Sequence, residues 1–276
     1  MTAGPEDRDG DLDTELDPAA IELALAGTPF QGRMRHFATI GSTNTYALQQ
    51  ARLGAPHGSF YVADEQTAGR GRSDHRWHSQ AGEGLYLSVL LRLRIAAGEL
   101  TWLPLLAGLA AHRAIVETIG RAVDLRWPND LLIGERKVGG ILVESIADAE
   151  AGIAAVVGIG INLHQRRFPP GLATEPTSLD LETGLETGPK ASRERLLISL
   201  LQTLHAEVAA LEAGQCAAIP ARVAAASSWV RGRSVTVHGP QVCAGVTEGL
   251  DGRGFLLVRT AEGLVTVTTG GIRDAG

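Results

Sequence analysis

The sequence predicts helices and strands in α/β order over the first three quarters of the chain, followed by a small all-β domain. Apolar residues recur at helical and at strand spacing in alternating segments through the first three quarters of the chain. From about Arg231 the apolar period falls to two, and glycine turns separate the short runs. With 276 residues and 44% hydrophobic content, the chain can form one large core and a small second domain.

Four segments are predicted as helices because apolar spacing coincides with a capping residue. Asp17-Pro18 supplies an N-cap and a first-turn proline for the first helix, and Ser42 or Thr43 can cap the second. In the third, Pro104 fits only if it lies in the first turn. The predicted helices span residues 18–27, 42–54, 100–119 and 192–213.

Short apolar runs between polar or glycine-rich turns predict the strands. The turn Gly134-Glu135-Arg136 predicts a hairpin between the strands on either side of it. Near the C-terminus, the alternating pairs Val235/Val237, Leu256/Val258 and Val265/Val267 suit a β-barrel of about 45 residues. The strands of the main domain are predicted at residues 34–38, 59–63, 85–93, 124–127, 131–133, 137–146 and 153–162.

Two segments lack an apolar period. Residues 1–17 are acidic and predict a disordered tail. His164–Lys190 is rich in Pro, Gly and Thr, and its length predicts a mobile lid. We therefore expect the tail, a main domain over residues 18–228 and a small β domain over residues 229–276.

Composition narrows the class of protein. The net charge of −6 disfavours non-specific attraction to nucleic acid or anionic lipid. No apolar run reaches the roughly 18 residues of a membrane span, and the N-terminus lacks the basic and apolar regions of a secretory signal. With Cys216 and Cys243 alone, neither a disulfide framework nor a cysteine-rich zinc site is expected. These features predict a soluble, cytoplasmic protein with no membrane or nucleic-acid partner.

The densest cluster of chemically useful residues lies in the polar segment 64–77. Gly69 and Gly71 allow a ligand to approach backbone N–H groups, and Arg70 and Arg72 carry planar charges suited to carboxylate or phosphate. Gln66 can donate and accept hydrogen bonds at once, as recognition of an amide-like ring requires. A solvated basic turn, or a segment that touches RNA, is the alternative. So many arginines in an acidic protein favour a ligand site.

A second cluster is formed by Arg126-Trp-Pro-Asn-Asp130 and the segment 137–144. Pro128 bends the chain so that Asn129 and Asp130 can face a cleft, although an ordinary Asx turn has the same sequence. Lys137 is one of two lysines among 25 basic residues, and Gly139-Gly140 beside it permits close approach of a ligand. A surface lysine on a hairpin is the alternative. The rarity of lysine in this chain favours a functional role.

Two motifs are weaker, and several familiar ones are absent. Gly41-Ser42-Thr43-Asn44 opens a helix, where such side chains are mostly caps. Gly158–Leu163 is a glycine-spaced strand, but it lacks the third glycine and the following helix of the dinucleotide fingerprint. The sequence has no phosphate-binding P-loop and no nucleophile elbow. His57, His75 and His78 lack the spacing of zinc ligands, so no metal site made of protein groups is predicted.

These segments, in this order, resemble the biotin–protein ligases, also called biotin–[carboxylase] ligases. The resemblance covers roughly residues 30–270. It implies an α+β fold. A mixed sheet flanked by helices would form a class II synthetase-like catalytic domain of the biotin–lipoate ligase type over residues 18–228, followed by an SH3-like β-barrel over residues 229–276. The segments that carry it are Gly41-Ser-Thr-Asn44, Glu65-Gln-Thr-Ala-Gly-Arg-Gly-Arg72, Gly84-Leu-Tyr-Leu-Ser88, Arg126-Trp-Pro-Asn-Asp130, Lys137-Val-Gly-Gly-Ile-Leu-Val-Glu144 and Gly158-Ile-Gly-Ile-Asn162.

The resemblance implies a two-step reaction. The carboxylate of biotin attacks the α-phosphorus of ATP and gives biotinyl-5′-AMP and pyrophosphate. A lysine amine of the biotin carboxyl carrier domain of an acyl-CoA carboxylase then displaces AMP. The first step joins two anions, so it needs fixed cations but no protein nucleophile. Mg²⁺ is expected to be carried mainly by the phosphates. The sequence leaves open whether the protein is a homodimer.

Carried over residue by residue, the resemblance implies three groups of site residues. The residues expected to contact biotin are Ser42, Thr43, Asn44, Gln66, Arg70, Gly71, Arg72, Lys137, Gly139 and Gly140. The residues expected on the nucleotide side are Trp77, which would pack near adenine, Asn129 and Asn162. The expected catalytic residues are Lys137 and Arg72 together with Asp130, which would either orient Lys137 or take the proton from the incoming amine.

The sequence departs from the family in two places and leaves two other functions to weigh. Asp74 and His75 stand where the family usually has Gly and Arg. Too few residues precede the first motif to form a winged-helix domain, so we expect no operator binding. A lipoate or octanoate ligase or transferase on the same fold would leave the polar groups of Gln66, Arg70 and Arg72 unpaired. A single-strand nucleic-acid-binding module would need several aromatic side chains on which bases stack, and only 4% of the residues are aromatic.

Overall fold

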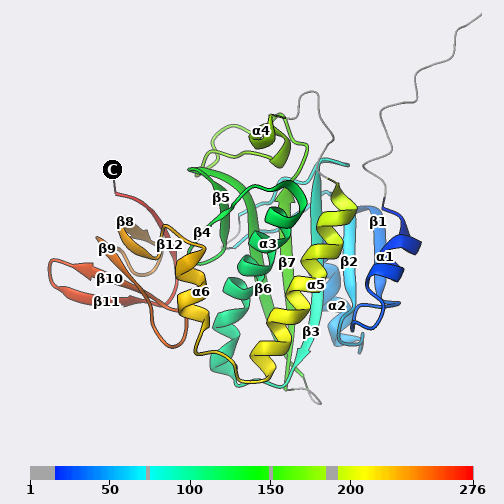
Figure 1. The fold of residues 1–276 in the computed structure, drawn as a ribbon, viewed down its shortest axis with the longest axis horizontal. Helices are drawn as coiled ribbons and strands as arrows, with labels where there is room; N and C mark the ends of the chain where they lie inside the picture. Colours follow the sequence, from blue (N-terminus) through cyan, green and yellow to red (C-terminus); the bar gives the residue numbers. More distant parts are fainter. Residues whose placement is uncertain (1–15, 73–74, 149–151, 185–191, 276) are drawn as a thin grey trace, which may run out of the picture.

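The computed structural model describes residues 16–72, 75–148, 152–184 and 192–275. Its main sheet has seven strands in the order β1-β2-β3-β7-β6-β5-β4 (Figure 1). Strands β1 and β2 run parallel, and every other neighbouring pair is antiparallel. This confirms the predicted mixed sheet and the hairpin at residues 134–136. The strands are β1 (Met34–Ile40), β2 (Phe60–Gln66), β3 (Gly84–Leu93), β4 (Asp124–Arg126), β5 (Asp130–Ile133), β6 (Arg136–Asp148) and β7 (Gly152–Asn162).

Helices cover both faces of this sheet (Figure 1). The helices α3 (Leu103–Ile119) and α5 (Arg193–Glu212) pack side by side on one face, over the large apolar core. On the other face, α2 (Thr43–Arg52) covers a smaller cluster through Ala47 and Ala51. The expected caps are present, because Ser42 accepts a hydrogen bond at the start of α2 and Gly120 ends α3 with a φ of 69°. The shorter helices are α1 (Pro18–Ala24), α4 (Leu179–Thr183) and α6 (Ile219–Ala225).

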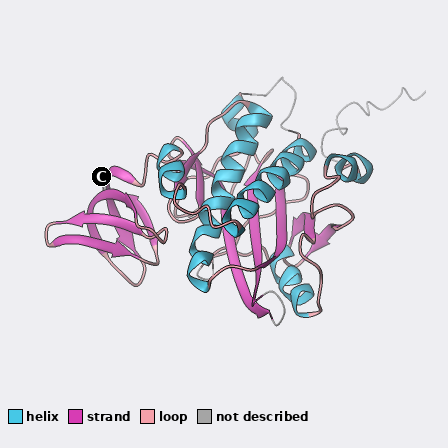
Figure 2. Ribbon diagram, turned by 60° about the horizontal axis from the view of Figure 1, so that its bottom comes forward, coloured by secondary structure: helices cyan, strands magenta, loops and turns pink. Residues whose placement is uncertain are grey.

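The C-terminal part forms a second, antiparallel sheet of five strands beside the first (Figure 2). Its order is β11-β10-β9-β8-β12, which is consistent with the predicted small barrel. Trp127 Nε1 donates to the carbonyl of Gly254 at 3.1 Å, and this bond helps to dock the second sheet on the main body. The strands are β8 (Arg231–His238), β9 (Cys243–Leu250), β10 (Leu256–Thr260), β11 (Gly263–Val267) and β12 (Gly271–Asp274).

Some expected elements need correction. The first residues of the helix predicted over 100–119 belong to a 3₁₀ turn, η1 (Ala97–Trp102), while Pro104 does lie in the first turn of α3. Residues 164–190 are not irregular throughout: the described part runs beside β6 and ends in α4. Of the tail predicted over 1–17, the structure describes Leu16 and Asp17, and Asp17 caps α1. The sequence reasoning missed α6, β9 and β12.

Among the residues described, no helix combines the length and the apolar character that crossing a membrane requires.

Candidate active site

A cavity of about 760 Å³ opens where four parts of the chain meet. Its walls come from the start of α2, the loop after β2, the segment 168–176 (hereafter the strap) and the edge of the second sheet near residues 238–240 and 269–273. Its floor is the middle of β6 and β7. The residues of the predicted site that line it are Ser42, Thr43, Asn44, Gln66, Arg70, Gly71, Arg72, Trp77, Asn129, Asp130, Lys137, Gly140 and Asn162. The structure therefore brings Arg72 and Lys137 into one cavity.

The floor of the cavity is bare backbone because two glycines face each other across neighbouring strands. Gly140 of β6 pairs with Gly160 of β7. A Cβ on Gly160 would lie 2.5 Å from the indole of Trp77, and a Cβ on Gly140 would lie 3.3 Å from it. Trp77 thus lies against the floor, with Lys137 Nζ 5.7 Å from its ring centroid. Its Nε1 atom is buried and has no hydrogen-bond partner among the described residues.

Gly139, which we expected in the same floor, faces the opposite side of the sheet. A Cβ at this position would lie 2.8 Å from Leu131 Cδ1. The cause is a bulge at Val138, since Leu131 pairs with Gly139 whereas Leu132 pairs with Lys137. One extra residue reverses the alternation of a strand. Lys137 and Gly140 therefore share the cavity face, and Gly160, not Gly139, completes the floor.

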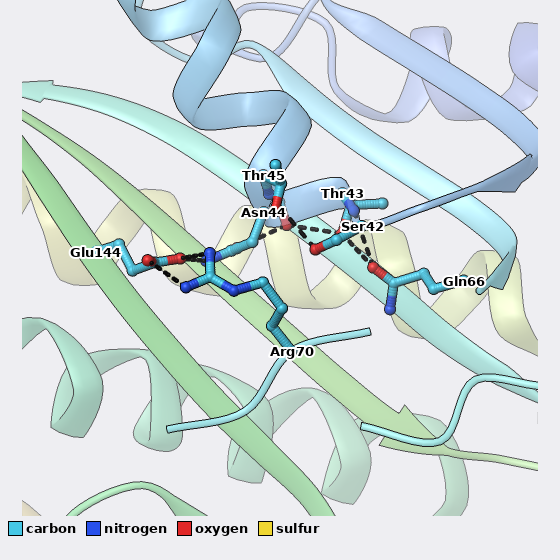
Figure 3. Close-up of polar contacts among 8 residues, drawn as sticks. Ser42, Thr43, Asn44, Thr45, Gln66, Arg70 and Glu144 are labelled. Carbon is cyan, nitrogen blue, oxygen red and sulfur yellow. Dashed lines mark hydrogen bonds and ion pairs between the residues drawn. The ribbon is translucent and has the colours of Figure 1, made fainter. Parts of the chain in front are cut away.

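One wall is a continuous hydrogen-bond network of polar side chains, which we call the amide wall (Figure 3). Thr43 donates to Gln66 Oε1 from its backbone nitrogen at 2.9 Å and from its hydroxyl at 3.0 Å. Ser88 Oγ lies 2.8 Å from both Thr43 Oγ1 and Asn44 Oδ1. Asn44 fits only because its neighbour is Gly158, where a Cβ would lie 2.3 Å from Asn44 Oδ1. This wall offers donors and acceptors to a neutral polar ligand.

Arg70, from the loop after β2, is tied to strand β6. Its two terminal nitrogens donate to the carboxylate of Glu144 at 2.9 and 3.0 Å (Figure 3). The same carboxylate accepts a hydrogen bond from Asn44 Nδ2 at 2.8 Å. Glu144 thus links the loop to the amide wall, although the sequence analysis gave it no role.

The opposite end of the cavity is cationic. Asp130 Oδ1 lies 2.5 Å from Lys137 Nζ, and Asp130 Oδ2 lies 2.6 Å from Arg126 Nη2. Burial raises the pKa of the Asp130 carboxyl, but the charges of Lys137 and Arg126 outweigh burial and hold this pKa below its ordinary value. Asp130 is therefore a carboxylate with two cationic partners at neutral pH.

Arg72 joins the two sheets at this cationic end. Its Nη1 donates to Asn129 Oδ1 at 3.2 Å and to the carbonyl of Gly270 at 3.0 Å. Asn129 is itself held by a hydrogen bond from its Nδ2 to the carbonyl of Ile141 at 2.7 Å. Burial lowers the pKa of Arg72, and the charge of Asp130 partly offsets this effect. An arginine stays protonated despite such a shift, so the cavity keeps this cation.

The strap closes the cavity on the side of Lys137. The backbone N–H of Lys137 donates to the carbonyl of Glu175 at 2.7 Å, and Asn162 Nδ2 donates to the carbonyl of Thr177 at 2.8 Å. Arg126 adds a bond to Thr174 Oγ1 at 2.7 Å. Asn162, expected on the nucleotide side, thus lines the cavity and also anchors the chain just after the strap.

These groups define what the cavity can bind. The amide wall suits a neutral head with hydrogen-bonding groups, and the cationic end suits carboxylate or phosphate. Within the described part of the chain, no cluster of three or more His, Cys, Asp or Glu side chains could hold a metal ion.

Sequence reasoning missed several residues that complete the cavity. Ser88 stood in a quoted motif without a role, and Arg126 was placed only as part of its motif. His238 and Arg273 come from the second sheet and line the cavity, where burial and the charge of Arg273 lower the pKa of His238. No sequence signal pointed to these two, because they lie far beyond Asn162, where the last of the other motifs ends.

Comparisons with known proteins agree with this geometry. Residues 36–162 match the family described as the Biotin/lipoate A/B protein ligase family. The biotin–[acetyl-CoA-carboxylase] ligase of Mycobacterium tuberculosis is 32% identical over 244 residues, which cover 85% of this chain and 86% of that protein. The bifunctional ligase/repressor BirA of Bacillus subtilis is 37% identical over 172 residues, which cover 62% of this chain. The chain spans about half the length of this relative, 53%.

A solved structure extends the likeness to the whole fold. The biotin protein ligase from Aquifex aeolicus, in complex with biotin and ATP, superposes with a TM-score of 0.71 at 29% sequence identity. The match covers 88% of this chain and 98% of that one.

Proposed function

Because the chain belongs to the biotin/lipoate A/B protein ligase family, we propose that it is an ATP-dependent ligase that activates biotin as biotinyl-5′-AMP and transfers it to a lysine of a biotin carboxyl carrier domain. The observation that carries the proposal is the single cavity that holds the amide wall at one end and Arg72 and Lys137 at the other. Residues 18–228 would form the catalytic domain and residues 229–276 the SH3-like barrel.

In the first step, an oxygen of the biotin carboxylate forms a bond to the α-phosphorus of ATP. The bond from that phosphorus to the bridging oxygen breaks, and pyrophosphate leaves. Both reactants are anions, so their approach depends on Lys137 and Arg72, which neutralise the developing charge and hold the reacting groups in place. Mg²⁺ would arrive with the phosphates, and no step assigned to the protein's residues depends on it.

The amide wall would receive the head group of biotin. Biotin carries a ring with N–H donors and a carbonyl acceptor, and Ser42, Thr43 and Asn44 provide partners of both kinds. Gly140 and Gly160 make room for the indole of Trp77 against the floor, so the ligand would meet Trp77 there and not the bare backbone. Asn129 and Asn162, which line the same cavity, would face the nucleotide. Trp77, whose Nε1 has no partner among the described residues, would pack near adenine.

In the second step, a carrier lysine amine attacks the acyl carbon, AMP leaves, and the amine loses a proton. Two roles were open for Asp130. The depressed pKa and the two cationic partners support the orienting role, because a carboxylate with a low pKa is a weak base. We propose that Asp130 fixes Lys137 and does not accept the proton of the amine.

The alternative is a lipoate or octanoate ligase or transferase on the same fold. A lipoyl or octanoyl head has no groups to pair with the amide wall, so its binding would leave buried donors and acceptors unsatisfied. Isothermal titration with biotin and with lipoate separates the two functions. Tighter binding of lipoate would favour the alternative.

The direct test is a transfer assay with biotin, ATP and a carrier fragment, run with the wild-type protein and with Lys137→Met. We expect biotinylated carrier from the wild type and little from the variant. Wild-type protein that makes no biotinyl-AMP and labels no carrier would overturn the proposal. The carrier of an acyl-CoA carboxylase is the proposed partner, the cytoplasm is the proposed location, and sedimentation of the purified protein would decide whether it is a homodimer.

A further inference from the structure

Glu144 of β6 lies outside the main cavity, yet it contacts two residues of its wall. It lines a smaller pocket behind the loop, together with Arg70 and Leu142. Its side chain is 24% exposed, whereas that of Arg70 is 43% exposed. Among the residues that the structure describes, the hydrogen bonds of Glu144 to the site go to Arg70 and Asn44.

The carboxylate of Glu144 settles the orientation of both neighbours. It accepts from Asn44 Nδ2, so Asn44 Oδ1 is turned toward Ser88. It also accepts both terminal N–H groups of Arg70, a bidentate geometry that restricts the guanidinium more than a single bond would. Because Ala68 N donates to the carbonyl of Gly41 at 2.8 Å, the segment Ala68–Arg72 is fixed to the start of α2 as well.

We infer that Glu144 is a positioning residue for the biotin end of the site, acting through Arg70 and Asn44. In this arrangement Arg70 shapes the wall and does not bind the ligand with its charge, which revises the direct biotin contact expected from the sequence. The inference rests on the proposed function for the identity of its ligand, but the geometry of the Glu144–Arg70 pair is independent of that function.

The test is Glu144→Gln, which keeps the size of the side chain. An amide oxygen at the position of Oε2 can still accept from Asn44 Nδ2 and Arg70 Nη1, but the amide NH₂ then faces Arg70 Nη2, so the bidentate bond is lost. We expect the KM for biotin in adenylate formation to rise about tenfold, with kcat within about twofold of wild type, a moderate effect because Arg70 is partly exposed. A loss confined to kcat, or no change in KM, would overturn the inference.

A double-mutant cycle with Arg70→Met tests the path of the effect. If Glu144 acts through Arg70, Glu144→Gln raises KM less in the Arg70→Met background than in the wild type. If Arg70 instead binds biotin directly, Arg70→Met alone raises KM more than Glu144→Gln does, and the two effects multiply. The second result would overturn the inference.

The matched control is Glu248→Gln. Glu248 forms the same bidentate pair with Arg259, at 2.9 Å for both bonds, on the second sheet and away from the cavity. This variant should leave KM and kcat unchanged. An equal rise in KM for both variants would assign the effect to general destabilisation and would overturn the inference.

Hydrogen exchange of the protein without ligand separates this inference from the proposed function. In Glu144→Gln, the peptide covering residues 66–72 should exchange about tenfold faster, while peptides of β3 and β7 stay unchanged. Unchanged exchange in residues 66–72 would overturn the positioning role, even in a protein that binds biotin. Faster exchange in Glu144→Gln, together with a wild-type protein that binds no biotin, would leave the positioning role in place and refute biotin as the ligand.

Discussion

Replacing Lys137 by arginine keeps a positive charge and changes its shape, so it tests whether the site needs a compact ammonium. Lys137 Nζ lies 2.5 Å from Asp130 Oδ1, and a Cβ built on Gly140 would be only 3.5 Å from the same nitrogen. The ammonium is thus held between a carboxylate and the strand backbone. A guanidinium spreads its charge over a wider plane and cannot occupy the same point.

Lys137→Arg should slow the first step as much as the loss of one well-placed charge at the reacting phosphorus. Removal of one such group slows catalysis about a hundredfold, which corresponds to about 2.7 kcal/mol in the first step, which needs no carrier. Biotin-dependent exchange of labelled pyrophosphate into ATP measures this step without a carrier. Lys137→Met serves as the variant that removes the charge, and thermal unfolding of both variants checks that they fold.

The reasoning fails if Lys137→Arg exchanges pyrophosphate within about threefold of the wild type while Lys137→Met loses about a hundredfold. That result would show that only the sign of the charge matters at this position.

Three further predictions follow from the geometry. Asp130→Asn should lower the free energy of unfolding by about 2 kcal/mol at neutral pH, less than for a fully buried pair because Lys137 is 28% exposed. The pKa of Asp130 is depressed in the folded protein, so this contribution is present above the unfolded pKa of about 3.9 and is lost as the pH falls through the folded pKa. A difference in unfolding free energy between variant and wild type that stays constant in urea from pH 7 to about pH 3 would contradict this. Gly158→Ala should displace Asn44 and weaken biotin binding about tenfold, measured by titration calorimetry. Wild-type affinity in this variant would show that the amide wall can shift without loss of binding. Biotinyl-AMP should slow hydrogen exchange in residues 68–72 and 164–177, and equal exchange with and without it would refute a closing loop and strap.

Features that depend on neighbouring residues were readable from the sequence. Ser42 caps α2 and Gly120 ends α3, because a cap is decided within one turn of helix. The strands of the main sheet were also found, since polar or glycine-rich turns bound their apolar runs. The short α6 was missed because its seven residues span only two turns.

Features that depend on register or on distant contacts were not readable. The bulge at Val138 decides that Gly140 and not Gly139 faces the cavity, and nothing in the Gly-Gly pair reveals that phase. In the sequence, Glu144 is a polar residue toward the end of an apolar strand. Its role depends on Arg70, which is 74 residues away in sequence and is brought to it by the fold. The contributions of His238 and Arg273 needed the placement of a whole second sheet.

The bond from Arg72 to the carbonyl of Gly270 joins residues that are 198 positions apart. During synthesis, a chain that has left the ribosome as far as α6 already possesses every strand of the main sheet, together with Lys137 and the amide wall. It has no partner for Arg72 at Gly270 and lacks one side of the pocket. The reactive groups are therefore synthesised before the second sheet that closes the cavity. A ribosome-stalled fragment ending at α6 would bind the ligand in a cavity that is open to water on that side.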